Sequence, residues 1–290
     1  MREKKSYILG LLLILLLSTG CSVQRMAIRS LGGVLDNSME ALYEEKDLEL
    51  AEKAIASDLK LLEGLIKSDP GNDKLLLLAA QGFTSYALGF VEDESPERAR
   101  DLYLRGRNYG LRILKQRENF ERAIQGSIEA LENMMGEFDE EDVPALFWTA
   151  NSWGNWINLS FTNTQALADL PRVQLLMERV IELDESYFYG GAHLFFGSNY
   201  AARPAMLGGD IEKSRSHFER CFEFAGEKFL LPYYYYARYY ATRQFDESLF
   251  ENTLVKILDA PNDILPEQNL PNAIAKNKAA GLLKKKSDLF

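Results

Sequence analysis

The sequence has few of the residues on which most enzymes and metal proteins depend. Its 290 residues include two cysteines and two histidines, too few for a disulfide framework or a zinc site with regular ligand spacing. His193 and His217 have no carboxylate motif beside them. No phosphate-binding loop and no nucleophile elbow occurs either. The sequence therefore indicates a protein that is not an enzyme and that uses no cofactor and no metal.

Proline, alternating β-branched runs and positive charge are also scarce. There are nine prolines, and no segment alternates Val, Ile or Thr with polar residues, which argues against sheets. The net charge is −10, so the chain lacks the basic surface that nucleic acid binding requires. An apolar content of 47% is that of a globular protein, and the length allows one elongated domain or two compact ones.

The N-terminus has the pattern of a targeting segment. Arg2, Lys4 and Lys5 precede the apolar run from Ile8 to Leu17, which is too short to span a bilayer comfortably. A small-residue stretch then ends at Cys21. This pattern resembles the bacterial lipoprotein signal, in which the chain is cleaved before the cysteine and the cysteine is lipidated. The alternative is a secretory peptide followed by an incidental cysteine.

We therefore divide the chain into a signal peptide (1–20), a tether (21–38) and a helical-repeat domain (39–290), with a possible subdivision at the acidic stretch 136–142. Acyl chains on Cys21 would anchor the mature protein to a membrane. Ser22 follows the cysteine, and by resemblance to the sorting rule of enteric bacteria this favours the outer membrane. The expected location is the periplasm.

The segment from Tyr187 to Gly226 reads as two helices joined by a turn, and Asp210 is placed to cap the second helix. Six residues follow the pattern of a tetratricopeptide (TPR) unit: Phe196, Gly197 and Tyr200 on the first helix, and Ser214, Phe218 and Cys221 on the second. Asp210 and Asp246 are 36 residues apart, close to the usual repeat length of about 34. The alternative is an ordinary helical hairpin.

Helix signals continue through the rest of the chain. They predict an all-α fold, a TPR-like solenoid of about 10–13 helices. The helices with the clearest boundaries are expected from Asp47 to Lys67, Leu75 to Val91, Ser95 to Lys115, Asn119 to Met135, Pro144 to Ser160, Asp169 to Leu183 and Asp246 to Leu258.

The stretch from Pro144 to Ser160 is unusual because it is both aromatic and polar. Asn151, Asn155 and Asn158 recur at helical spacing and are flanked by Trp148 and Trp156. Asparagine is a poor helix-interior residue, so three in register favour the wall of a ligand cleft. The alternatives are an interhelical hydrogen-bond network and a plain surface.

Two further residues are candidates for this cleft. Arg203 lies in a lengthened turn, Ala201–Leu207, where it would meet an acidic ligand. Tyr236 lies in a tyrosine-rich segment, most of which we expect to pack between repeats. A nucleophile pair of Cys221 with His217 is also conceivable, but Cys221 stands at a small packing position, which favours a structural role.

The second half contains several runs of rare residues in a fixed order: Phe147-Trp148-Thr149-Ala150, Ser152-Trp153-Gly154, Trp156-Ile157, Leu170-Pro171-Arg172-Val173, Tyr189-Gly190-Gly191-Ala192-His193-Leu194-Phe195, Leu207-Gly208-Gly209-Asp210, His217-Phe218-Glu219, Lys228-Phe229-Leu230-Leu231 and Tyr239-Tyr240-Ala241. These runs resemble the TatT family, the T-component of tripartite ATP-independent periplasmic (TRAP) transporters.

The resemblance implies a periplasmic, lipid-anchored, all-helical protein with TPR-like repeats. It also implies a homotrimer, docking of the transporter's periplasmic substrate-binding protein, and a pore or cleft that relays a small hydrophobic or organic-acid ligand. Two other functions stay open on the residues alone. One is a TPR lipoprotein scaffold for envelope protein assembly, and the other is a hydrolase that uses Cys221.

Overall fold

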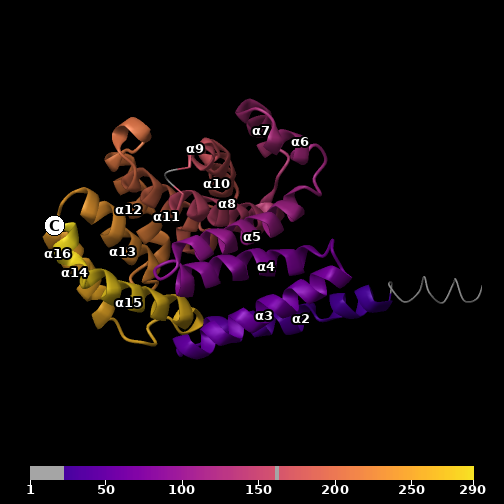
Figure 1. Ribbon diagram of the computed structural model, residues 1–290, viewed down its shortest axis with the longest axis horizontal. Helices are drawn as coiled ribbons and strands as arrows, with labels where there is room; N and C mark the ends of the chain where they lie inside the picture. Colours follow the sequence, from indigo (N-terminus) through magenta and orange to yellow (C-terminus); the bar gives the residue numbers. More distant parts are fainter. Residues whose placement is uncertain (1–22, 161–162) are drawn as a thin grey trace, which may run out of the picture.

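The computed structural model describes residues 23–160 and 163–290, and within these ranges it contains helices and no strands (Figure 1). The prediction of an all-helical fold is confirmed. The signal peptide and Cys21 lie outside the described residues, so the proposed lipidation stays a prediction.

Residues 23–30 are helical, and the helices that follow are α2 (Gly32–Tyr43), α3 (Leu48–Ser68), α4 (Asp73–Tyr86), α5 (Pro96–Leu114), α6 (Phe120–Gln125), α7 (Ile128–Met135), α8 (Val143–Asn158), α9 (Thr164–Ala168), α10 (Leu170–Asp184), α11 (Tyr187–Ala202), α12 (Ile211–Ala225), α13 (Leu231–Tyr235), α14 (Glu247–Asp259), α15 (Asn269–Leu283) and α16 (Lys286–Leu289). Two π-helical segments, η1 (Ala87–Val91) and η4 (Tyr236–Ala241), continue α4 and α13. Three short 3₁₀ turns are η2 (Glu140–Asp142), η3 (Ala205–Leu207) and η5 (Pro266–Gln268).

Aspartate caps fix the starts of three helices, as predicted. The Asp47 carboxylate accepts from two backbone N–H groups at the start of α3, the Asp210 carboxylate does the same at α12, and Asp246 accepts from Leu249 N at α14. Each cap satisfies N–H groups that have no partner inside the helix. These boundaries are therefore set locally by the sequence.

The single helix expected from Asn119 to Met135 is instead two helices, α6 and α7. The chain is extended at Gly126, and the Ser127 hydroxyl accepts from Ala130 N to begin α7. A glycine followed by a capping serine ends one helix and begins the next, because glycine weakens the helix interior and serine favours the N-cap. The sequence-based reading missed this break.

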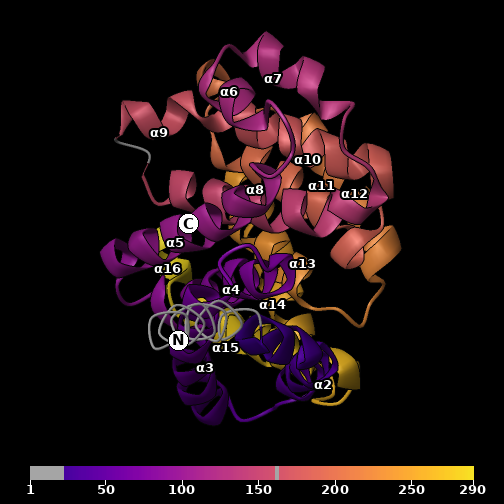
Figure 2. The ribbon, with the colours of Figure 1, turned by 90° about the vertical axis from the view of Figure 1, so that its right-hand side faces the viewer.

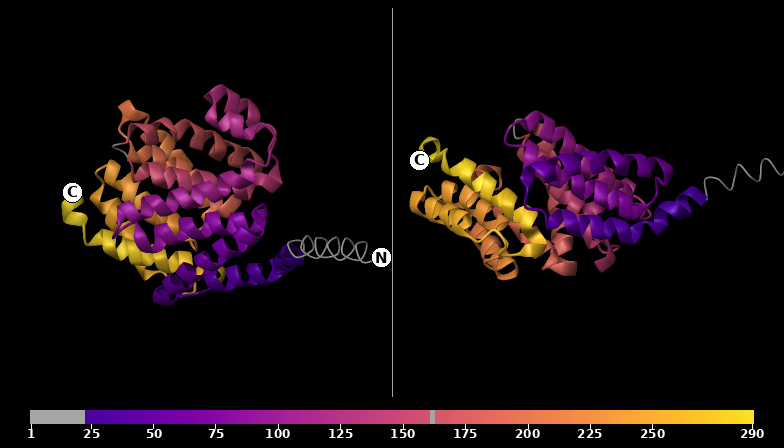
Figure 3. Two further views of the ribbon diagram at one scale, coloured as in Figure 1. Left: turned by 45° about the vertical axis from the view of Figure 1, so that its right-hand side comes forward. Right: turned by 90° about the horizontal axis from the view of Figure 1, so that it is seen from below.

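The helices stack in chain order and then return to the N-terminal end. α3, α4, α5, α8 and α10 are successive neighbours, and α11 packs on α12. Figure 2 shows α6 and α7 at the end opposite α2, α3 and α15. In Figure 3 the C-terminal helix α15 meets α2 and α3 along one side of the molecule. There the Asn269 side chain donates to the Glu44 carbonyl at 3.0 Å.

The segment expected to be a tether, residues 21–38, is helical over most of its described length. Ile28 is buried, Arg29 Nε donates to Asp69 Oδ2 at 2.9 Å, and Lys74 Nζ pairs with Asp36 Oδ2 at 2.5 Å. The segment contains Gly32 and Gly33, which weaken a helix, but apolar contacts to α3 and α4 hold it in helical form.

Leu146, Ala150, Trp153 and Ile157 recur at helical spacing on one face of α8, and all four are buried. By length and composition, the helix Asp73–Val91 is apolar enough to cross a membrane. Over half of that stretch is buried against neighbouring helices, and its leucines belong to the protein core.

The α11–α12 hairpin packs as the repeat pattern predicted. A side chain at Gly197 would meet the Phe218 ring at 2.9 Å, and Ser214 Oγ donates to the Gly197 carbonyl at 2.7 Å. Cys221 lies fully buried in the same interface. Small residues on both helices therefore permit the close approach, and the phenylalanine fills the groove between them.

Candidate functional site

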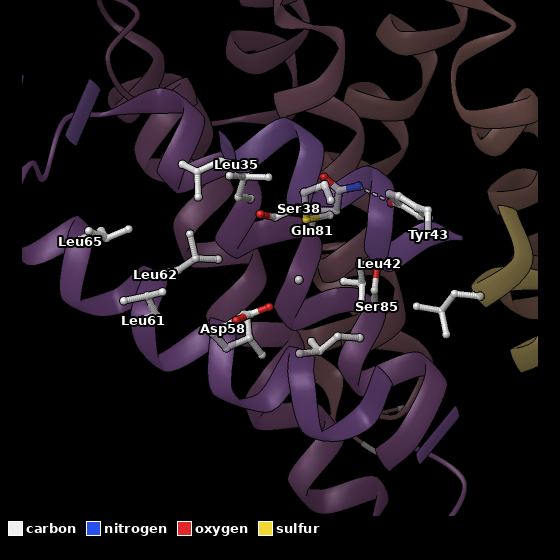
Figure 4. A pocket seen from close by; sticks show the side chains of 16 residues that line it. Leu35, Ser38, Leu42, Tyr43, Asp58, Leu61, Leu62, Leu65, Gln81 and Ser85 are labelled. Atoms are coloured by element: carbon white, nitrogen blue, oxygen red, sulfur yellow. Dashed lines mark hydrogen bonds between the residues drawn. The ribbon is translucent and has the colours of Figure 1, made fainter. Parts of the chain in front are cut away.

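An apolar cavity of about 150 Å³ lies between α2, α3 and α4, and we call it the aliphatic cavity. Figure 4 shows leucines around its wall; the lining leucines are Leu35, Leu42, Leu59, Leu61, Leu62, Leu65, Leu78 and Leu270. Two of its polar side chains are bonded to the protein. Gln81 Nε2 donates to the Tyr43 hydroxyl, and Ser38 Oγ donates to the Val34 carbonyl at 2.9 Å. This cavity is therefore suited to an apolar group.

A second cavity, of about 70 Å³, adjoins the first, and we call it the junction cavity. Tyr43, Ile55, Ser85 and Leu270 line both. The remaining wall includes Trp148, which α8 supplies from the second half of the chain. The junction cavity therefore connects the N-terminal helices with the region where the sequence predicted a ligand cleft.

A third cavity, also of about 70 Å³, lies beyond the junction, and we call it the asparagine cavity. Asn151, Phe188 and Leu231 line both it and the junction cavity. Its other polar lining residues are Asn155, Asn158, Ser198, Tyr235 and Tyr239. Shared lining residues thus place the junction cavity between the other two, so that the three cavities follow one another from an aliphatic end to a polar end.

The asparagine stripe is partly bonded within itself and partly free. Asn155 Nδ2 donates to the side-chain oxygen of Asn151 at 2.9 Å and to its carbonyl at 3.0 Å. Asn158 Oδ1 and Ser198 Oγ are buried, and neither has a hydrogen-bond partner among the described residues. Buried polar atoms are nearly always satisfied in native proteins, so these two mark the polar end as a place where a partner is missing.

A left-handed turn positions a ring that lines both of the smaller cavities. Phe188, Tyr189 and Gly190 have φ values of 47°, 58° and 71° at the start of α11. Only glycine adopts this region readily, so the first two residues are strained. The turn sets the Phe188 ring 5.1 Å from Trp148 and 6.0 Å from Phe229, centroid to centroid. The strain is therefore located at the wall of the cavities.

The structure brings together four of the predicted cleft residues. Asn151, Asn155 and Asn158 line the asparagine cavity, and Trp148 lines the junction cavity. The sequence-based reading did not find Phe188, which completes the wall from a different helix. A run of aromatic residues around the turn was visible in the sequence, but the left-handed conformation that aims the ring was not.

The other three candidates line none of the three cavities. Trp156 is half-buried and carries the Arg107 guanidinium over its ring at 5.7 Å. Arg203 is buried, and its Nε donates to a backbone carbonyl one turn earlier in α11 at 3.0 Å. Tyr236 packs edge-on against Phe218 at 5.2 Å, within the hairpin interface. Their roles in ligand binding stay untested predictions.

Two hollows of larger volume occur elsewhere. One, of about 520 Å³, lies beside α6 and α7 and is lined by exposed residues such as Glu118 and Arg122. The other, of about 470 Å³, lies beside α15 and includes the exposed Lys284 and Lys285. Charged side chains line both hollows, whereas none line the junction and asparagine cavities.

The two histidines form a bonded pair, and a carboxylate that no sequence motif indicated lies beside them. His193 Nε2 is 2.9 Å from Glu185 Oε1, and His193 Nδ1 is 2.8 Å from His217 Nδ1. Hydrogen bonds from Arg220 lower the pKa of Glu185 to about 2. Burial lowers the pKa of His217 to about 4. Glu185 was missed because the left-handed turn, which is not visible in the sequence, folds it back onto α11.

Cys221 is not paired with a histidine. Its Sγ donates to the Tyr189 carbonyl at 3.6 Å, and burial raises the pKa of the thiol to about 12. A thiolate nucleophile is therefore not available at neutral pH. Within residues 23–160 and 163–290, no group of three His, Cys, Asp or Glu side chains is placed to hold a metal ion.

Comparison with known proteins identifies the family to which this chain belongs. A model of the family described as "TAtT: TRAP transporter T-component" matches residues 44–290. The chain therefore belongs to the T-component family of TRAP transporters, and the resemblance seen in the rare residue runs is confirmed. This is a family of transporter components of the cell envelope and not a family of enzymes.

A protein of Treponema pallidum (strain Nichols) is also similar to this chain. It is 28% identical over 234 residues, which cover 70% of this chain and 72% of the relative. That protein is described as uncharacterized. The similarity extends over most of both chains, but its name points to no ligand and no partner.

Proposed function

We propose that this protein is the lipid-anchored T-component of a TRAP-type transporter, and that it relays a small, largely apolar ligand through its three cavities. In this proposal Cys21 carries the lipid anchor at the periplasmic face of the outer membrane. The protein forms a homotrimer and receives the periplasmic substrate-binding protein of the transporter.

One observation carries the relay: the three cavities share walls in sequence. Four residues join the aliphatic cavity to the junction cavity, and Asn151, Phe188 and Leu231 join the junction cavity to the asparagine cavity. A ligand that enters at one end meets apolar side chains first and amides last. Such a gradient orients an elongated ligand without a covalent step, as a relay requires.

A plug at the first junction tests the relay. Ser85 is small and lines both the aliphatic and junction cavities, so Ser85→Phe should fill the connection. We expect binding of 1-octanol, measured by titration calorimetry, to weaken at least tenfold, and uptake in cells with the cognate permease to fall. The matched control is Ser57→Phe, on an exposed position of α3.

Equal octanol binding and equal uptake by the two variants would contradict the relay. In that case the proteins that co-purify with this chain distinguish between the remaining functions. Recovery of a substrate-binding protein keeps a docking role, whereas recovery of a barrel-assembly complex supports the envelope scaffold. Cys21→Ala tests the anchor separately, since it should release the protein from membranes or leave an uncleaved precursor.

A further inference from the structure

The two ends of the cavity line differ in how their polar groups are satisfied. At the aliphatic end, Tyr43, Gln81 and Ser38 have partners within the protein. At the other end, Asn158 Oδ1 and Ser198 Oγ are buried without one. An unpaired buried oxygen is unfavourable, so the site is completed when a ligand supplies the missing hydrogen bonds.

Ser198 is not needed for the packing of its helix. The adjacent Gly197 faces α12, where it contacts Phe218 and accepts from Ser214. Ser198 lies on another face of α11, is 7% exposed and lines the asparagine cavity. Its hydroxyl is therefore a polar group held in an apolar wall, opposite the asparagines of α8.

The lining of the asparagine and junction cavities carries no formal charge. None of their lining residues is Lys, Arg, His, Asp or Glu. Burial raises the pKa of Tyr235 far above its usual value, so its hydroxyl stays neutral. The one charged residue of the whole line, Asp58, is exposed and lies at the aliphatic end. A buried carboxylate without a cation is strongly unfavourable.

Building on the proposed relay, we propose that the ligand is a neutral amphiphile with a hydrogen-bond donor at its polar end, such as a hydroxyl or a primary amide. This end binds at Asn158 and Ser198. Asn158 Oδ1 accepts from the donor, while the Ser198 hydroxyl donates to the oxygen of the same group. The apolar chain extends through the junction cavity toward the leucines. The small volume of the junction cavity, about 70 Å³, favours an unbranched chain, and its neutral wall favours an uncharged ligand.

Three ligands of the same chain length test the polar end: 1-octanol, 1-methoxyoctane and octanoate, each titrated calorimetrically into the purified full chain at pH 8. Octanol can donate and accept, methoxyoctane can only accept, and octanoate is charged. We expect octanol to bind about tenfold more tightly than either of the others, the change that one hydrogen bond makes.

Two variants locate the contact. Asn158→Leu should weaken octanol binding about tenfold and leave methoxyoctane binding unchanged, because it removes only the group that accepts from the ligand. Ser198→Ala should weaken the binding of both octanol and methoxyoctane about tenfold, because the oxygen of each accepts from the Ser198 hydroxyl. Ser38→Ala is the matched control, because that hydroxyl already donates to a carbonyl at the far end. It should bind all three ligands as the native chain does. If Asn158→Leu fails to fold, Ser198→Ala alone decides.

Either of two results would overturn the neutral polar end: octanoate that binds as tightly as octanol, or a Ser198→Ala variant that binds octanol as the native chain does. In both cases the cavities would still bind ligand, so the relay would stand. Failure of all three ligands to bind would remove the relay and the polar-end inference together.

Discussion

Two of the regions that bury polar groups in this molecule treat them in opposite ways. Beside η1 and η4, Lys278 Nζ lies 2.8 Å from Glu92 Oε1 and 2.6 Å from Asp93 Oδ2, and the Tyr103 hydroxyl donates to Glu92 Oε2 at 2.6 Å. Arg238 completes this ion network at 3.7 Å from Glu92. In the asparagine cavity, two buried oxygens have no partner.

The comparison distinguishes polar groups that stabilise the fold from polar groups that are available to a ligand. In the ion network, every charged group lies near a group of opposite charge. Removing one partner therefore leaves the other as an uncompensated buried charge, which is unfavourable. In the asparagine cavity, the unpaired atoms contribute nothing favourable to the empty protein. Variants in the first region should therefore change stability, and variants in the second should change binding.

The largest expected effect comes from Lys278→Met. It leaves the buried Glu92 carboxylate without its nearest cation, and we expect the free energy of unfolding to fall by about 3–5 kcal/mol in urea titrations. Octanol binding by the folded fraction should be unchanged. The double variant Glu92→Gln with Lys278→Met should lose less, since it removes both charges. A loss below about 1 kcal/mol for Lys278→Met would mean that the network does not stabilise the fold.

The next effect is a pH dependence from the histidine pair. His217 stays neutral in the folded state down to a pKa of about 4, because of burial and the neighbouring His193 and Lys213, whereas unfolded histidine takes up a proton near pH 6.5. Between these values the unfolded state binds more protons. Stability should therefore fall as pH drops from about 6.5 to about 4, by roughly 1–3 kcal/mol.

Urea titrations of the native chain and of His217→Phe at several pH values measure this dependence. The phenylalanine keeps the aromatic stack with Phe196 and Tyr200 but does not titrate, so its stability should change less over the same interval. Parallel curves for the two proteins would show that another group titrates there.

Asn151→Leu and Trp156→Ala form a pair that contrasts binding with stability. Asn151 lines two cavities, so its leucine variant should change stability by less than about 1 kcal/mol but impair octanol binding and uptake. Trp156→Ala should lower the melting temperature through lost packing, and the folded protein should bind octanol normally. Two destabilised variants with normal binding would make the stripe structural.

The smallest effect is expected for Ser198→Ala in the absence of ligand. Because the hydroxyl is buried and unpaired, its removal should leave the free energy of unfolding unchanged or raise it by up to about 1 kcal/mol. Thermal unfolding of the ligand-free protein measures this. A clear loss of stability would mean that the hydroxyl makes a favourable contact within the protein.

Features that depend only on residues close together in the sequence were predictable. The caps at Asp47, Asp210 and Asp246, and the buried face of α8, follow from spacing alone, because both are properties of one helix. The asparagine stripe was found for the same reason. Trp156, Arg203 and Tyr236 line none of the three cavities, because which side chains meet a cavity depends on how turns join the helices, and their roles in ligand binding stay predictions.

The rest of the site depends on contacts between distant segments. Phe188 and Leu231 reach the asparagine cavity from other helices, and Glu185 reaches His193 only because of three left-handed residues in a row. The aliphatic cavity also needs α2. This helix was not predicted, because the two glycines in it are typical of a segment without regular structure. Backbone strain and long-range packing leave no periodic signal, so no pattern in the sequence indicates them.

The π-helical segment η4 has a consequence for the length of the chain. A π turn holds one more residue than an α turn, and Tyr239 on this segment lines the asparagine cavity while Arg238 belongs to the ion network. Deleting one residue within Tyr236–Ala241 would restore α geometry with the flanks still in register, but the segment would then present one side chain fewer. One of the two regions would then lose its side chain. Homologous chains should therefore accept substitutions in this segment more readily than single-residue deletions.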